Sequence, residues 1–119
     1  MLNKKVGLAL AAMLLAPVAV NAQEVPTAFN QCKACHKVEA GKHGVGPSLA
    51  GVYGAKAGHA AGYKYSEAHL KSGLTWDDAN LGKYLADPKG TIPGNKMAYA
   101  GLKKPEDVQA VINYLKTLK

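Results

Sequence analysis

The chain has 119 residues, a formal net charge of +7 at pH 7 and two cysteines. This length suits one domain, and two cysteines are too few for a disulfide framework or a four-cysteine zinc site. The sequence contains 15 lysines and no arginine. Specific recognition of nucleic acid favours the planar guanidinium of arginine, so we expect no nucleic-acid partner.

The first 22 residues have the pattern of a secretory signal peptide. Lys4 and Lys5 precede a run of apolar or small residues over 6–20, and Ala22 completes a small-x-small cleavage pattern. The run is shorter than the roughly 20 residues of a membrane-spanning helix, so an uncleaved anchor is the less favoured alternative. Export would leave one domain, 23–119, in the periplasm.

The motif Cys32-Lys33-Ala34-Cys35-His36 follows a short helix predicted by the helical spacing of Val25, Phe29 and Cys32. Two cysteines three residues apart, followed at once by histidine, are typical of c-type haem attachment. On one helical turn both thiols can form thioethers with the haem, and the histidine can ligate its iron. A redox dithiol and half of a zinc site are the alternatives, but zinc needs four ligands.

The next segment, 37–65, contains seven glycines and one proline, which predicts a long irregular loop. Long loops in compact domains are usually functional, and wrapping a cofactor is such a function. A short helix is expected from Ser66 to Leu70, ended by Gly73.

Two further helices are expected in the C-terminal half. The capping box at Thr75 predicts a helix from Trp76 to about Asp87, which Pro88 stops. A second loop follows over 88–104, and Pro105 begins the last helix. Its buried stripe is expected to contain Val108, Val111, Ile112, Leu115 and Leu118. With no strand pattern, the fold class is all-α.

Met97 is the expected second axial ligand of the iron. It is the only methionine outside the expected signal peptide, because Met1 and Met13 lie within it. A thioether opposite a histidine favours ferrous iron and raises the reduction potential. Gap-filling in the core is the alternative, but Met97 lies in a proline- and glycine-containing loop without apolar periodicity.

Three histidines are rival sixth ligands. We expect His43 to be a neutral loop histidine bonded to a backbone carbonyl. We expect His59 at the surface and His69 on the exposed side of the short helix. None has a context comparable with that of Met97.

Taken together, these stretches resemble the class I c-type cytochromes, in particular soluble bacterial members close to mitochondrial cytochrome c. The resemblance covers nearly all of 28–119. Its motifs are Cys32–His36, Gly46-Pro47-Ser48-Leu49, Gly62-Tyr63-Lys64-Tyr65, Gly73-Leu74-Thr75-Trp76, Asp87 to Met97, and Ala100-Gly101-Leu102-Lys103-Lys104. It implies a small all-α fold in which three to five helices and two long loops wrap one haem c, bound covalently through Cys32 and Cys35.

The resemblance also implies roles for individual residues. The Pro47 carbonyl would accept a hydrogen bond from the free ring nitrogen of His36. Tyr65 and Trp76 would donate to a buried haem propionate, and Tyr84 would reach the Met97 sulfur. Each aromatic residue has plain core packing as its alternative. Phe29, Tyr114 and Leu115 would form the contact between the first and last helices.

Three positions depart from the mitochondrial pattern. Ala55 stands where an arginine usually lies near the propionates, and His69 replaces an asparagine that helps to order an internal water near Tyr84. Val25 occupies the position of a small glycine at the crossing of the terminal helices, in a first helix that looks truncated. We therefore expect that crossing to be looser or shifted.

The function implied is a periplasmic one-electron carrier between membrane redox complexes, a monomer and not an enzyme. Exposed lysines around the haem edge would dock on acidic patches of a bc-type complex, a terminal oxidase or a photosynthetic reaction centre. These lysines are Lys42, Lys89, Lys96, Lys103 and Lys104. The protein itself would contact the membrane only through these partners. The alternatives are a haem peroxidase or gas sensor, which needs an open iron site, and an electron-input module of a larger enzyme.

Overall fold

The computed structural model describes residues 24–119, and the expected signal peptide, 1–22, lies outside them. Within this range the chain forms one 3-10 helix and four α-helices. They are η3 (Thr27–Gln31), α1 (Glu67–Lys71), α2 (Asp78–Ala86), α3 (Pro88–Thr91) and α4 (Pro105–Leu115). The β pairing recorded over 24–119 is one isolated bridge between Lys56 and Thr75. The predicted all-α class is confirmed, and no helix of the described range is long and apolar enough to cross a membrane.

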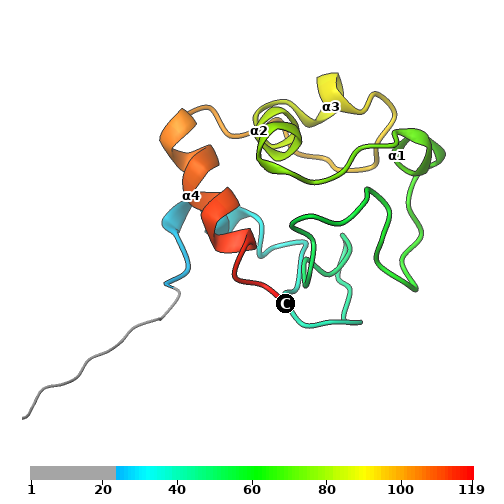
Figure 1. Ribbon diagram of the computed structural model, residues 1–119, viewed down its shortest axis with the longest axis horizontal. Helices are drawn as coiled ribbons and strands as arrows, with labels where there is room; N and C mark the ends of the chain where they lie inside the picture. The colour runs from blue at the N-terminus through cyan, green and yellow to red at the C-terminus, as the bar shows by residue number, and fades with distance from the viewer. Residues whose placement is uncertain (1–23) are drawn as a thin grey trace, which may run out of the picture.

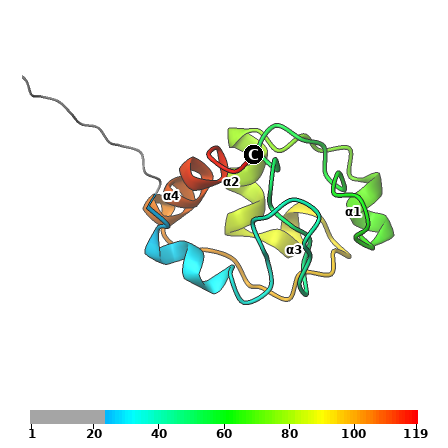
Figure 2. The ribbon, with the colours of Figure 1, turned by 90° about the horizontal axis from the view of Figure 1, so that it is seen from below.

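The helices pack in a chain of contacts that places the two ends of the domain together. α2 packs against both α3 and α4, and α4 packs against η3; α1 lies on the opposite side of the fold (Figure 1 and Figure 2). At the crossing of η3 and α4, the Phe29 and Tyr114 rings meet edge to face with centroids 4.8 Å apart. The predicted contact between the first and last helices is confirmed.

The first helix is shorter than its sequence pattern suggested. It begins at Thr27, so Val25 precedes it and is 41% exposed, whereas Phe29 is 1% exposed. The predicted inclusion of Val25 in the helix is therefore wrong.

The predicted boundaries of the middle helix also need correction. α2 begins at Asp78, and its N-cap is Asp77, whose carboxylate accepts from the Asn80 N–H at 2.8 Å. The cap predicted at Thr75 is wrong, because the backbone next to it is hydrogen-bonded to the first loop instead of starting a helix. The Trp76 N–H donates to the Ala55 carbonyl at 2.8 Å, which keeps this segment extended against the long loop.

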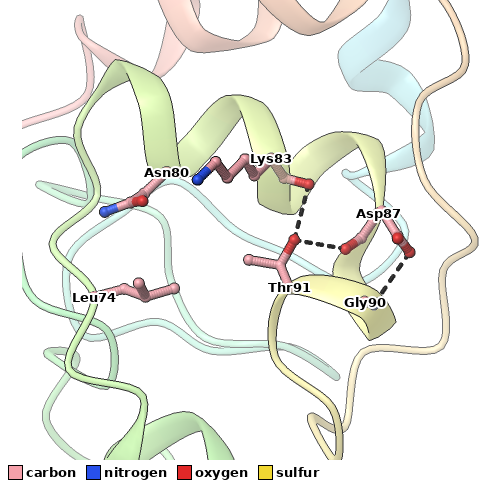
Figure 3. A pocket seen from close by; sticks show the side chains of 6 residues that line it. All are labelled: Leu74, Asn80, Lys83, Asp87, Gly90 and Thr91. Atoms are coloured by element: carbon pink, nitrogen blue, oxygen red, sulfur yellow. Dashed lines mark hydrogen bonds between the residues drawn. The ribbon is translucent and has the colours of Figure 1, made fainter.

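Pro88 ends α2, as predicted, but it also begins the short helix α3, which sequence reasoning missed. The Asp87 carboxylate caps α3 by accepting from the Gly90 N–H at 3.1 Å. The Thr91 hydroxyl donates to the carbonyls of Lys83 and Asp87, at 3.0 and 2.8 Å (Figure 3). These bonds fix α3 to the end of α2, beside a shallow surface pocket.

The remaining helices follow their predicted signals. The Ser66 hydroxyl caps α1 by accepting from the His69 N–H at 3.1 Å. Proline is the first residue of α4, and its buried face contains Val111, Ile112 and Leu115. Val108 is only partly buried at the edge of the core. Leu118, predicted in the same stripe, lies beyond the end of the helix at Leu115 and is also partly buried.

The first loop is irregular, as predicted, whereas the second predicted loop, 88–104, begins with α3 and is irregular only after it. Each loop is fixed to α2 or to the segment before it. The second loop returns to α2 at Gly101 and Leu102. The Leu102 N–H donates to the Leu85 carbonyl at 2.7 Å. Gly101 has φ +117°, and a Cβ there would lie 2.1 Å from the Ala86 carbonyl oxygen. Only glycine therefore lets the loop approach α2 this closely.

Candidate functional site

The long loops, α2 and α4 enclose a mainly apolar cavity of about 430 Å³. All of the site residues predicted from sequence line it, namely Cys32, Cys35, His36, Pro47, Tyr65, Trp76, Tyr84 and Met97. They come from the turn after η3, from both loops, from the segment before α2 and from α2 itself, so the fold brings together positions distant in the sequence. An apolar cavity with a few polar groups at its wall suits a flat, largely apolar cofactor.

The two cysteines lie on one turn at the end of η3. The N–H groups of Cys35 and His36 both donate to the Cys32 carbonyl, at 3.1 and 2.9 Å, and both thiols are free. Burial raises the pKa of the Cys32 thiol, and the neighbouring Cys35 raises it further. A raised pKa disfavours a redox dithiol, whose chemistry needs a thiolate. Over 24–119 no group of three or more His, Cys, Asp or Glu side chains could hold a zinc ion.

The ring of His36 is fixed by the first loop. Its Nδ1 donates to the Pro47 carbonyl at 2.7 Å, which leaves Nε2 unprotonated and able to bind a metal. Burial lowers the pKa of His36, and the hydrogen bond to Pro47 opposes that shift. The loop passes close to this ring at Gly46, where a Cβ would lie 2.5 Å from the imidazole Cε1. A larger residue at this position would displace the ring.

Met97 lies at the cavity wall in the second loop and is near Tyr84 of α2. The Tyr84 hydroxyl donates to the Met97 sulfur over 4.0 Å. Burial raises the pKa of Tyr84 to about 12, so the phenol remains a protonated donor at neutral pH. The pairing of these two side chains, which the family resemblance implied, is present in the structure.

The two proposed propionate donors both lie in the cavity wall. Trp76 is 4% exposed. The Tyr65 hydroxyl accepts from the Ala60 N–H at 3.1 Å, so its own proton is free to be donated. A phenol and an indole in an apolar wall provide polar groups for an acidic substituent of the cofactor.

His69 is not on the exposed side of α1, and that prediction is wrong. Its ring lies in the cavity wall, stacked on Tyr65 with centroids 4.9 Å apart. It is also 6.0 Å from the Trp76 ring and 6.1 Å from the Tyr84 ring. Tyr65 lies before the extended cap residue Ser66, so helical spacing does not relate the two rings, and the sequence carried no local signal for their contact.

The position of His69 predicts how folding stability changes with pH. Burial lowers its pKa in the folded chain. As pH falls through the ordinary histidine range, near 6.5, the unfolded chain takes up this proton first, so the free energy of unfolding decreases. We expect His69→Asn to flatten the decrease between pH 7 and pH 5 in denaturant titrations. Equal slopes in His69→Asn and wild type would contradict the prediction.

The other two histidines are held by backbone groups. His43 Nε2 donates to the Ala61 carbonyl at 2.9 Å, and its Nδ1 accepts from the Ser48 N–H at 2.9 Å. His43 is therefore the neutral loop histidine that we expected, and it joins two parts of the first loop. His59 is exposed at the cavity rim, with Nε2 3.4 Å from the Ala50 carbonyl.

Comparison with known proteins agrees with this site. The family model described as cytochrome c matches residues 22–119. The chain is 70% identical over 96 residues to cytochrome c2 iso-2 of Magnetospirillum molischianum, which covers 81% of this chain and 99% of the relative. It is 66% identical over 98 residues to cytochrome c2 of Rhodoplanes tepidamans, covering 82% of this chain and all of that relative.

A solved structure extends the agreement to the fold. Cytochrome cH from Methylobacterium extorquens matches with a TM-score of 0.72 and 56% identity, covering 76% of this chain and 91% of the other. The residues that line the cavity also fit haem c, because paired thiols, an imidazole and an apolar wall meet there. The chain therefore belongs to the cytochrome c family, as an electron-transfer protein that carries haem c with its iron and is not an enzyme.

Proposed function

We propose that this cytochrome is a periplasmic one-electron carrier whose haem c is attached through Cys32 and Cys35, with His36 and Met97 as the axial ligands. The bound haem supplies a reversible couple between ferric and ferrous iron. The observation that carries the proposal is that these four side chains line one cavity. Met97 is also the only methionine of 23–119.

The surrounding residues would tune and orient these groups. The hydrogen bond from His36 to the Pro47 carbonyl would hold the proximal imidazole in one orientation and increase its basicity. Tyr84 would withdraw electron density from the Met97 sulfur by donating to it. Tyr65 and Trp76 would donate to a propionate, which a buried carboxylate requires.

The proposed location depends on the first 22 residues, whose pattern is that of a signal peptide. The family match begins at residue 22, which supports a domain boundary near the proposed cleavage site. Mass spectrometry of the protein isolated from its host would test cleavage after Ala22. Recovery in the periplasmic fraction with residue 23 at the N-terminus is the expected result, and an intact N-terminus would contradict it.

An optical spectrum tests the ligand set directly. The ferric protein should be low-spin at neutral pH, with the weak far-red band given by a sulfur ligand opposite histidine. A high-spin ferric spectrum would refute ligation by Met97 and would indicate the open iron site of a peroxidase or sensor.

We propose acidic docking patches on membrane redox complexes as the partner surfaces. Cleavage of the signal peptide would remove Lys4 and Lys5 and lower the formal charge from +7 to +5, still basic. The lysines proposed to dock are all exposed, namely Lys42, Lys89, Lys96, Lys103 and Lys104. Transient complexes of this kind are governed by charge at the rim of the interface.

This proposal predicts that electron transfer slows as salt increases. We expect the second-order rate with a terminal oxidase or reaction centre to fall several-fold between about 0.05 and 0.5 M salt, because screening weakens steering. Stopped-flow or flash measurements would give the rates. A small uncharged reductant is the control, since its rate should stay constant. A salt-independent rate with the protein partner would exclude docking through lysines.

A further inference from the structure

We propose that Asn95 and Lys89 are positioning residues that hold the backbone of Met97 and so keep its sulfur at the iron. This inference rests on the proposed ligation by Met97 and adds to it the means by which the ligand is retained. We call these two side chains the Met97 clamp. No sequence motif singled out either residue for this role.

Asn95 uses its whole side-chain amide within the second loop. It is 6% exposed, and its Nδ2 donates to the carbonyls of Pro88 and Ile92, both at 2.9 Å. Its Oδ1 accepts from the Met97 N–H at 2.7 Å. A buried amide with both donors and its acceptor engaged allows little rotation, because any change leaves a buried polar group without a partner.

Lys89 holds the other polar group of the same residue. Its ammonium donates to the Met97 carbonyl at 2.9 Å and lies 3.4 Å from the Asn95 carbonyl. Hydrogen bonds from a charged donor are stronger than neutral ones. The N–H and the C=O of Met97 are therefore both bound by side chains of the clamp.

The clamp connects Met97 to the rigid part of the fold. Lys89 belongs to α3, and the Asn95 amide donates to the carbonyl of Pro88, the first residue of α3. The Thr91 hydroxyl in turn fixes α3 to α2. The loop between α3 and Met97 contains Gly94 at φ +92°. Glycine restrains the backbone least of all residues, so without the clamp little would hold this loop in place.

This anchoring matters because a thioether is a soft ligand that prefers ferrous to ferric iron. In the ferric state, retention of the sulfur depends strongly on how well the protein holds it in place. A loop fixed at both polar groups of Met97 makes departure of the sulfur unfavourable, since leaving would break charged and buried hydrogen bonds together.

The test measures how readily the sulfur leaves ferric iron. Added imidazole binds only after the sulfur has dissociated, so its limiting binding rate reports that step. We expect Asn95→Ala to raise this rate about tenfold or more, and Lys89→Ala about threefold, in line with the loss of buried and exposed hydrogen bonds.

Two control variants separate the clamp from general destabilisation. Asn80→Ala removes an amide that donates to the Thr75 carbonyl at 2.8 Å, a comparable bond elsewhere. Lys103→Ala removes one positive charge, as Lys89→Ala does, but at another exposed lysine, whose ammonium lies 3.4 Å from the Ala100 carbonyl. Both controls should bind imidazole within twofold of wild type. The free energy of unfolding is measured for every variant in denaturant.

Each outcome bears on one proposal. A wild-type protein without the far-red band refutes ligation by Met97, and the clamp with it. A wild type with that band, but with clamp variants no faster than the controls, refutes the clamp alone. Rates that simply follow the unfolding free energy across all four variants also refute it. Should Asn95→Ala fail to fold, Lys89→Ala decides, because its side chain is at the surface.

Discussion

Replacing Met97 with alanine is expected to abolish the far-red band of the ferric protein and to lower its reduction potential by on the order of 0.1 V or more. Axial ligands set haem potentials over a range of about 0.8 V, and a thioether favours the ferrous state. Met97 is the only methionine of 23–119, so no second thioether can replace it. Optical spectroscopy and a redox titration measure the two effects.

The control for this variant is Leu49→Ala, which removes volume from the same cavity wall but leaves both proposed axial ligands in the sequence. Its spectrum should remain low-spin and its potential should change far less. Retention of the far-red band in Met97→Ala would show that another residue supplies the sixth ligand, and the proposed ligand set would then be wrong.

The largest loss of folding stability is expected for Phe29→Ala. This ring is 1% exposed and meets Tyr114 at the crossing of η3 and α4. Truncating a buried phenylalanine to alanine costs about 3–5 kcal/mol, a large share of the about 5–15 kcal/mol that stabilises a typical domain. Denaturant unfolding of the haem-loaded protein, followed by circular dichroism, measures the change.

Tyr114→Phe is the matched control, because it keeps the ring that Phe29 contacts and removes only the hydroxyl. Its free energy of unfolding should lie within about 0.5 kcal/mol of wild type, as for most changes outside the core. A small loss for Phe29→Ala would mean that the crossing of the terminal helices contributes little to the fold.

Features that depend on residue type and near neighbours could be predicted from the sequence. The haem motif, the start of the last helix at Pro105 and the cap at Ser66 each depend on a few adjacent side chains, and the structure contains the elements they indicate. The contact between His36 and Pro47 was predictable only through the family resemblance. Nothing in the spacing alone brings those two residues together.

The errors occurred where tertiary contacts decide between local alternatives. Thr75 and Asp77 can both cap a helix, and pairing of Trp76 with the first loop selects Asp77. α3 was missed because Pro88 was read only as a stop, although proline also suits the first turn of a helix. For His69, a helix of five residues was too short to show which face is buried.

The cavity at the centre of the fold has a consequence for the order of biogenesis. Empty interior volume costs on the order of 24 cal/mol per Å³, so a cavity of about 430 Å³ would cost about 10 kcal/mol. That is comparable with the whole stability of a small domain. The polypeptide without its haem should therefore be largely unfolded. We therefore expect haem attachment at the turn of Cys32 and Cys35 to precede stable folding, so that the cavity is filled as the chain packs around it.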